Sequence, residues 1–370
     1  MHSAIGSTGW LWAVAALLAA CGDRVAETGE PHTWRLEPLY TVGSLEGPDA
    51  FGRVQSILAD ADGRLYVGDA QASAIAVFDS TGARVGAIGR AGRGPGEMTR
   101  LQSLAWLGDT LAVMDAGNAR IGLFDRQGSW LGQFAHQALT GPALWVRFHR
   151  AAGSGAWAMQ INRENPRSPN LWVRFASSGP VDTILSPPAE TQPVPSAVTC
   201  QVSGGISFFS IPFGAQGFFT FTPKGDVLRA WTGAYHLAVT TRLGDTLRVL
   251  AGTATRAPIS DAEWDSASAD WRAFQSRAPG AACEGAYRRP DHKPAVRFAF
   301  HDAEARLWVE RYGTDGFLWD IWEEGQVVGS LEGPLRDAAL EPYARRGRFY
   351  AVTRDSLGVQ RVRAFRVVRE

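Results

Sequence analysis

The stretch VQSILADADGRLYVGDAQASAIAVFDSTGARVGAIGRAGRGPGEM, residues 54–98, decides the fold. It contains four short apolar runs followed by a glycine-rich exit. Asp62-Gly63 and the Asp-Ser-Thr-Gly segment at 79–82 supply the residues that tight turns prefer. The pattern therefore predicts a four-stranded antiparallel meander, in which we interpret Asp62 and Asp79 as turn formers and not as catalysts.

The next segment repeats this plan. Leu-Gln-Ser-Leu at 101–104 echoes Val-Gln-Ser-Ile at 54–57, and further apolar runs follow at 111–113, 121–124 and 130–134. The period of roughly 46 residues is typical of propeller blades. Because one such small sheet cannot bury both of its faces, several must pack in a ring.

Three motifs carry a resemblance to a known family. The segment GRAGRGPGEM at 89–98, the Gln-Ser strand after it, and Asp-Ala-Gly-Asn at 115–118 resemble NHL-type repeats. The whole chain resembles bacterial six-bladed β-propeller lipoproteins, most clearly over residues 40–134. NHL-type propellers include sensor domains, nucleic-acid binders and a few metal-dependent enzymes, so the resemblance implies a scaffold and no single activity.

Six second-strand signatures predict six blades; they lie at 65–67, 111–113, 156–158, 227–229, 307–309 and 349–351. The hexapeptide Gly-Ser-Leu-Glu-Gly-Pro occurs at 43–48 and again at 329–334, where it follows a run that ends a blade. We therefore expect the strand at 39–45 to be the outer strand of the last blade, paired with 362–368. The predicted fold is an all-β, six-bladed propeller closed by this N-terminal strand, with one inserted helix.

The N-terminus resembles a bacterial lipoprotein signal. An apolar run at 10–20 ends in Leu18-Ala19-Ala20-Cys21, which resembles the lipobox, although no Lys or Arg precedes the run. The resemblance implies a signal peptide at 1–20, lipidation of Cys21, a flexible tether at 21–33 and a propeller at 34–370. By the same resemblance, Gly22 after the cysteine favours a location at the outer membrane or the cell surface over retention in an inner membrane. An ordinary signal peptide with an incidental Cys is the alternative.

Two insertions, around 186–205 and 253–290, lengthen the later blade spacings. The second contains a helix signal, since Ser260 and Glu263 have the spacing of a capping box. Its apolar residues, which share one helical face, are Trp264, Ala267, Trp271 and Phe274. We expect this face either to pack on the flank of blades four and five or to form a lid over the central channel.

The remaining cysteines, Cys200 and Cys283, lie one in each insertion. In a secreted protein such an even pair favours a disulfide, because connections between consecutive blades lie on the same face of the ring. Two unpaired buried thiols are the alternative.

Charge and motif content narrow the function. Lys+Arg 37 balance Asp+Glu 37, so nucleic-acid binding is disfavoured. We find no Gly-x-Ser-x-Gly, His-Glu-x-x-His or Walker motif, and therefore name no catalytic residue, metal ligand or cofactor. His149, His292 and His301 lie near inner strands and could meet a metal in the channel, although such scattered histidines are more often structural.

Arginines gather ahead of the inner strands. Arg53 and Arg100 occupy equivalent positions before Gln55 and Gln102, Arg90 and Arg93 lie between them, and Arg288, Arg289 and Lys293 precede the inner strand of blade five. In a closed ring these places converge on one face around the channel, where guanidinium groups suit carboxylate, phosphate or sulfate. Our candidate ligand-binding residues are Arg53, Gln55, Arg100, Gln102, Arg288 and Arg289; solvated rim charges are the alternative.

The favoured function is a lipid-anchored, extracytoplasmic, non-enzymatic binding protein for a peptide, a glycan or an anionic small molecule. We expect a monomer attached to a membrane by lipid. The alternative is a metal-dependent hydrolase or lyase that uses the central channel.

Overall fold

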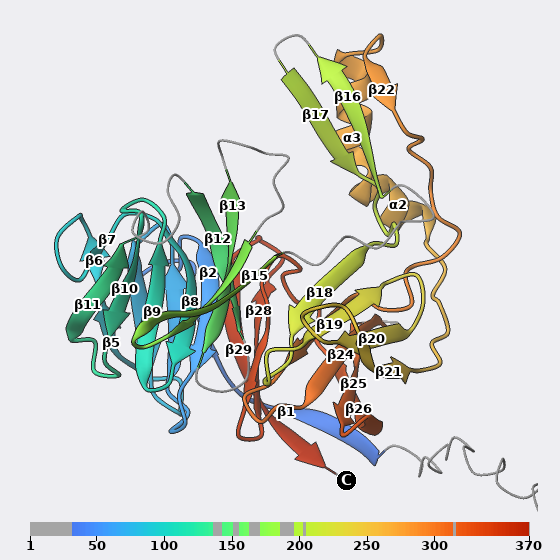
Figure 1. Ribbon diagram of the computed structural model, residues 1–370. Helices are drawn as coiled ribbons and strands as arrows, with labels where there is room; N and C mark the ends of the chain where they lie inside the picture. Colours follow the sequence, from blue (N-terminus) through green and yellow to red (C-terminus); the bar gives the residue numbers. More distant parts are fainter. Residues whose placement is uncertain are drawn as a thin grey trace, which may run out of the picture.

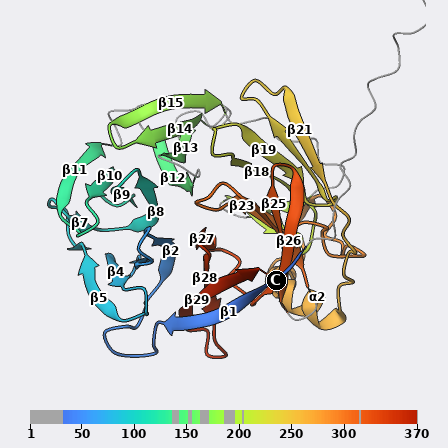
Figure 2. The same cartoon turned by 90° about the horizontal axis from the view of Figure 1, so that it is seen from below.

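The computed structural model describes residues 32–135, 143–150, 155–162, 171–185, 196–202, 205–313 and 316–369. Within these residues, six four-stranded blades stand side by side in a ring (Figure 2). The first blade contains β2 (Val54–Ala59), β3 (Leu65–Asp69), β4 (Ala74–Phe78) and β5 (Arg84–Ile88). The second contains β8 (Leu101–Leu107), β9 (Thr110–Asp115), β10 (Arg120–Phe124) and β11 (Trp130–Ala135).

The third blade contains β12 (Ala143–Arg150), β13 (Ala156–Asn162), β14 (Leu171–Ala176) and β15 (Gly179–Leu185). The fourth contains β18 (Gly217–Phe221), β19 (Val227–Trp231), β20 (His236–Thr240) and β21 (Thr246–Ala251). The fifth contains β23 (Phe298–His301), β24 (Leu307–Tyr312), β25 (Phe317–Glu323) and β26 (Gln326–Gly333). The sixth contains β27 (Tyr343–Arg345), β28 (Arg348–Arg354), β29 (Gln360–Arg369) and β1 (His32–Val42).

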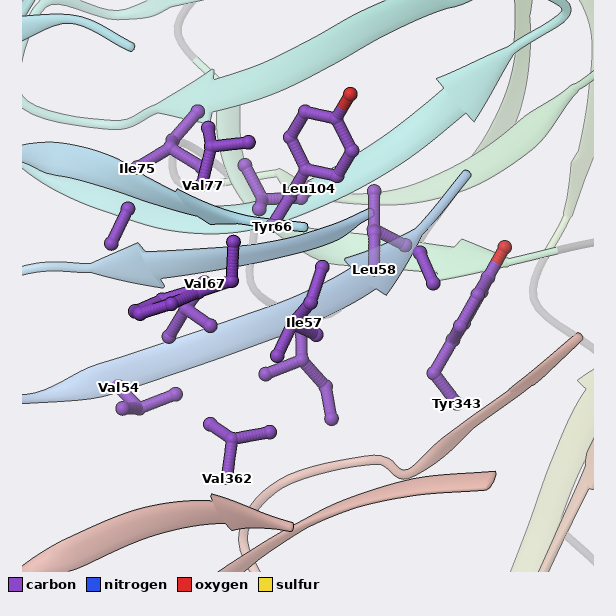
Figure 3. Packing of buried hydrophobic residues seen from close by; sticks show 14 of the residues in the cluster. Val54, Ile57, Leu58, Tyr66, Val67, Ile75, Val77, Leu104, Tyr343 and Val362 are labelled. Carbon is purple, nitrogen blue, oxygen red and sulfur yellow. The ribbon is translucent and has the colours of Figure 1, made fainter. Parts of the chain in front are cut away.

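The six signatures each lie in the second strand of a blade, so the predicted all-β, six-bladed propeller is confirmed. Neighbouring blades cover both faces of each sheet, and for this reason β3 and β10 are buried along their whole length. Between the last blade and the first, Val54 and Ile57 of β2 lie near Val362 of β29 (Figure 3). The hydrophobic core is thus divided among the blade interfaces.

The ring closes through the two ends of the described chain. Strand β1 runs antiparallel to β29 from the pair Trp34↔Arg369 to the pair Val42↔Val362, which confirms the predicted pairing. The strand begins earlier than the expected residue 39 because Trp34 is buried against the fifth blade. It ends at Val42, since Gly43 adopts φ +102°. The first residues of β1 also pair with β26 in parallel, at His32↔Gly329.

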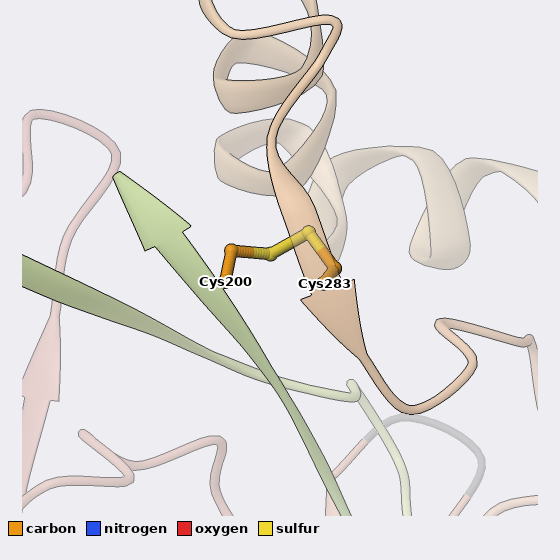
Figure 4. Close-up of a disulfide and its surroundings, with 2 residues drawn as sticks. All are labelled: Cys200 and Cys283. Carbon is orange, nitrogen blue, oxygen red and sulfur yellow. A yellow bond between two sulfur atoms is a disulfide. The ribbon is translucent and has the colours of Figure 1, made fainter. Parts of the chain in front are cut away.

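The two insertions form one small subdomain that rises from one side of the ring (Figure 1). It contains β16 (Ala197–Val202), β17 (Gly205–Ser210), β22 (Ala282–Glu284), α2 (Asp261–Ala267) and α3 (Ala269–Arg277). Cys200 and Cys283 are paired across β16 and β22 and form a disulfide with an S–S distance of 2.07 Å (Figure 4). The disulfide therefore joins the two insertions covalently.

The inserted helix begins as the sequence indicates, because Ser260 caps it and Glu263 completes the capping box. Its packing differs from both expectations. The apolar face contacts the β16–β17 hairpin. The ring centroids of Phe274 and Trp271 lie 4.4 and 5.1 Å, respectively, from the ring centroid of Phe209. The helix is also interrupted at Ser268. Packing on the blade flank and a lid over the channel are thus both wrong, because each expectation considered one insertion without the other.

Among the described residues, no helix has the length and apolar character needed to cross a membrane.

Candidate ligand-binding face

The face of the ring that carries the insertion subdomain, here called the insertion face, is also where the inner strands begin. Every connection from the outer strand of one blade to the inner strand of the next runs over this face. The first such connection contains the short strands β6 (Arg90–Ala91) and β7 (Glu97–Met98), which lie on the same side as the insertion in Figure 1. The residues just before β2 and β8 therefore open onto this face.

Inner strand β2 contains a bulge at Gln55. Val54 pairs with Asp69 and Ser56 pairs with Gly68, so Gln55 is the extra residue. The Val54 N–H donates to the side chain of Gln360 in the last blade at 2.8 Å. On the other side, the Ser56 hydroxyl accepts a hydrogen bond from the Leu104 N–H of the second blade at 3.1 Å. The residues on either side of Gln55 thus contact opposite neighbouring blades, and Gln55 itself lies at the start of the inner strand on the insertion face.

Inner strand β8 repeats this arrangement at Gln102. Leu101 pairs with Asp115 and Ser103 pairs with Met114, which leaves Gln102 as the bulged residue. The Ser103 hydroxyl accepts a hydrogen bond from the Phe148 N–H of the third blade at 2.9 Å. In both Gln-Ser pairs of the sequence, Ser therefore joins adjacent blades and Gln is the bulged residue at the start of the inner strand.

Arg53 and Arg100 are positioned through their backbones. The Arg53 N–H donates to the Asp69 carboxylate and the Arg100 N–H donates to the Asp115 carboxylate, each at 3.0 Å. Both arginine side chains are exposed, and neither makes a hydrogen bond or ion pair with another described residue. Because β2 and β8 are neighbours, the structure brings Arg53, Gln55, Arg100 and Gln102 to adjacent places on the insertion face.

The connection between these two blades is rigidly held. The buried Arg120 guanidinium donates to the carbonyl oxygens of Gly94 and Glu97, each at 2.7 Å. Glu97 in turn accepts the Gly94 N–H at 2.8 Å and pairs with Arg90. These donors lower the pKa of Glu97. Arg120 and Arg90 are therefore paired within this connection.

Arg289 and Lys293 belong to the foot of the insertion subdomain. Arg289 pairs with Asp261 at 2.6 Å, and Lys293 pairs with Glu263 at 2.6 Å, which lowers the pKa of Glu263 to about 2. Arg288 is exposed. The Arg289 side chain is thus bound to the start of α2. It does not lie directly before an inner strand, as Arg53 and Arg100 do.

The equivalent residue of the fifth blade is Arg297, which the sequence analysis missed. In the first blade, the second-strand signature begins at Leu65, which pairs with Ala59 of the inner strand, and Gln55 lies four residues before Ala59. In the second blade, Leu111 pairs with Trp106, and Gln102 lies four residues before Trp106. The same count gives Arg297 in the fifth blade. In the fourth blade it gives Gly217, which pairs regularly with Trp231 and is not bulged. The Arg297 N–H donates to the carbonyl oxygen of Glu310, the residue that pairs with Phe298, as expected for a bulge. We call Gln55, Gln102 and Arg297 the mouth positions.

The histidines do not form a described metal site. His292 lies in the insertion segment, where its backbone forms an isolated β-bridge with Pro258. His301 lies at the last position of β23, where burial lowers the pKa of its imidazole to about 4. The side chain of His149 is outside the described residues, as is all of Cys21. In the described part of the chain, no three His, Cys, Asp or Glu side chains are grouped so that they could hold a metal ion.

Comparisons with known proteins agree with this architecture. Residues 44–144 match the family model DUF5128, a six-bladed β-propeller. A DUF4221 family member from Bacteroides vulgatus is 11% identical with a TM-score of 0.51, over 92% of this chain and 100% of that chain. A putative exported protein from Bacteroides fragilis is 11% identical (TM-score 0.48; 93% of this chain, 98% of that chain). The virginiamycin B lyase of Staphylococcus aureus is 11% identical (TM-score 0.46; 91% and 100%).

No curated protein matches the chain. At this level of identity the likeness to the solved structures concerns the fold alone.

The anchoring role of Asp115 gives a stability prediction. Its buried carboxylate accepts the Thr99 and Arg100 N–H groups and the side chain of Asn118, and it lies 3.7 Å from Arg120. Asp115→Ala should lower the free energy of unfolding by about 3–5 kcal/mol, because it leaves Arg120 buried without its carboxylate. Asp109→Ala, which removes an exposed pair with Arg126, should cost about 1 kcal/mol or less. Urea unfolding of both variants measures the two losses in free energy of unfolding. Equal losses would contradict the anchoring role of Asp115.

Proposed function

We propose that this protein is a lipid-anchored, extracytoplasmic propeller that binds an anionic ligand at the channel mouth on its insertion face, without catalysing a reaction. One observation carries the proposal: two adjacent blades present the same set of an Asp-anchored backbone, an exposed arginine and a bulged glutamine. A repeated arrangement that leaves Arg53 and Arg100 exposed does little for folding, because exposed charges contribute little to stability. It does suit ligand recognition.

The chemistry of these groups favours an anion. A guanidinium group offers a planar set of N–H donors that matches carboxylate, phosphate or sulfate oxygens. The Gln55 and Gln102 amides add neutral donors and acceptors from the inner strands. Because the backbones of Arg53 and Arg100 are fixed by buried carboxylates, only their side chains must be ordered when a ligand binds. Among the classes considered from the sequence, an anionic small molecule or an anionic group on a peptide or glycan is therefore preferred.

The proposed location rests on two features. Leu18-Ala19-Ala20-Cys21 resembles a lipobox, and the disulfide between Cys200 and Cys283 is of the kind that persists in oxidising compartments. With Cys21 acylated, the polar segment that precedes β1 would tether the propeller to the membrane.

The anchor is tested with Cys21→Ser. Because each buried CH₂ of an acyl chain contributes about 0.8 kcal/mol to membrane attachment, loss of the acylation site should release a folded propeller into the soluble fraction. Membrane fractionation of the variant and the wild type, with a melt of the released protein, provides the measurement. A variant whose signal has been cleaved and which still sediments with membranes would show that another element holds the protein there.

The anion site is tested with the double variant Arg53→Gln/Arg100→Gln. Citrate, a small multivalent carboxylate, is the probe in calorimetric titration. Each lost charge-assisted hydrogen bond is worth about 1.5–3 kcal/mol, so the double variant should bind citrate at least about tenfold more weakly. Its melting temperature should stay close to that of the wild type, because both arginines are exposed.

The matched control is Arg64→Gln/Lys224→Gln, which removes two exposed positive charges from turns between first and second strands, on the opposite face. This control should retain wild-type affinity. Equal losses in both double variants would indicate a general charge effect. Failure of the wild type to bind citrate, or unchanged binding in the Arg53/Arg100 variant, would overturn the role of these arginines.

A further inference from the structure

The small sheet of the insertion subdomain ends in an unpaired strand edge. Its strand order is β17-β16-β22, so within the described chain β17 has a neighbouring strand on one side only. The Ile211 N–H donates to the Ser196 carbonyl oxygen at 2.8 Å, and in an antiparallel pair the bonded residues alternate along each strand. Every second residue of β17, counted from Ile211, therefore bonds to β16. Ile206 and Phe208 belong to the other set, so their N–H and C=O groups point to the free edge.

This edge lacks the features that protect the outer edges of the blades. The outer strands of blades one to four, β5, β11, β15 and β21, each pair with a register shift, and such shifts interrupt a regular edge. In contrast, β17 pairs with β16 in unbroken register from Ala197↔Ser210 to Val202↔Gly205. The sequence of β17, Gly-Ile-Ser-Phe-Phe-Ser, contains no proline and no charge. The edge is therefore open to a further strand.

The same strand exposes two large apolar side chains. Ile206 is 59% exposed and Phe208 is 72% exposed, and both lie on one face of the sheet because they are two residues apart. The other face is covered, since Phe209 of β17 and Val198 of β16 pack with Phe274 of α3. The disulfide fixes β16 to β22. The free edge is thus a rigid template with an apolar outer face.

We propose that β17 binds an extended, uncharged peptide segment of another protein, which adds to the subdomain sheet as a fourth strand. The outward N–H and C=O groups of Ile206 and Phe208 supply the main-chain hydrogen bonds of this pairing. Aromatic or β-branched side chains at alternate positions of the segment pack beside the two exposed side chains. Residues 191–223 contain no Asp, Glu, Lys, Arg or His, so this part of the chain offers no partner to a charged segment. The site does not use the mouth positions, and it goes beyond the proposed function.

The direction of the hairpin favours a peptide segment over a second copy of this chain. Two antiparallel copies of β17 are related by a two-fold axis perpendicular to the sheet, which reverses the long direction of the hairpin. The subdomain rises from one face of the ring, and β1 begins on the side away from it (Figure 1). The two rings would therefore lie at opposite ends of such a dimer, with their lipid tethers leading apart. One membrane could not hold both proposed anchors, whereas a peptide segment has no such constraint.

The probe is the uncharged peptide acetyl-Gln-Thr-Val-Thr-Val-Thr-Gln-amide, measured by calorimetric or NMR titration. Its control has the same sequence with N-methyl groups on one valine and on the threonine next to it, which block both edges of the peptide and keep its side chains. The wild type should bind the probe saturably and the N-methylated peptide at least about tenfold more weakly, because main-chain hydrogen bonds are lost. Equal binding of the two peptides, or no saturable binding of the probe, would overturn the inference.

Phe208→Pro and Phe208→Thr form a matched pair of variants. Both remove the ring, but only proline removes the outward N–H, which is not bonded to β16, so the hairpin should keep its own ladder and both variants should melt close together. Phe208→Pro should bind the probe at least about tenfold more weakly than Phe208→Thr. Equal affinities in variants that melt alike would contradict strand addition at this edge.

Two further measurements separate the alternatives. Arg53→Gln/Arg100→Gln should bind the probe as the wild type does, and a loss of probe binding in this variant would place the peptide on the ring and overturn the inference. In sedimentation velocity without peptide, the wild type should be a monomer. A wild-type dimer that Phe208→Pro abolishes would assign the edge to a second copy instead. Citrate binding that depends on Arg53 and Arg100, with no binding of the probe, would leave the proposed function standing without this inference.

Discussion

The pairing of β1 with β29 is the interaction on which the rest of the molecule depends. It completes the sixth blade with a strand from the other end of the chain, and the burial of Trp34 fixes the start of that strand against the fifth blade. Without it, the last blade would keep an open edge of unpaired backbone groups. Closure also fixes how the six inner strands converge, because each blade can then sit at only one distance from the axis.

The ring divides its stability and its chemistry between different parts of each blade. The second and third strands are buried and regular, and they supply the packing between blades. The starts of the inner strands are irregular. There, β2 and β8 each contain a bulge, and buried acids such as Asp69 and Asp115 hold the backbone in place. The local irregularity is thus supported by specific hydrogen bonds, as expected where a fold presents side chains to a ligand.

The sequence was sufficient for the architecture because its signals are local and repeated. The Asp-Gly turns, the period and the duplicated hexapeptide each depend on a few neighbouring residues, and they predicted the blades and the closing pair. The bulge at Gln55 was not visible, since it exists only relative to Asp69 and Gly68 on the partner strand. Arg297 was missed because an insertion displaces its blade and no Gln-Ser pair marks it. The packing of α3 on the hairpin likewise required both insertions together.

The central claim is that the adjacent starts of β2 and β8 form one anion site on the insertion face, and a crystal structure grown with 4-bromobenzoate tests it most directly. Bromine can be located by anomalous scattering independently of the protein phases. The account predicts a bromine site on the insertion face, with the carboxylate within hydrogen-bond distance of the Arg53 or Arg100 guanidinium. Bromine sites confined to the outer strands or to the insertion subdomain, with Arg53 and Arg100 in contact with solvent alone, would contradict it.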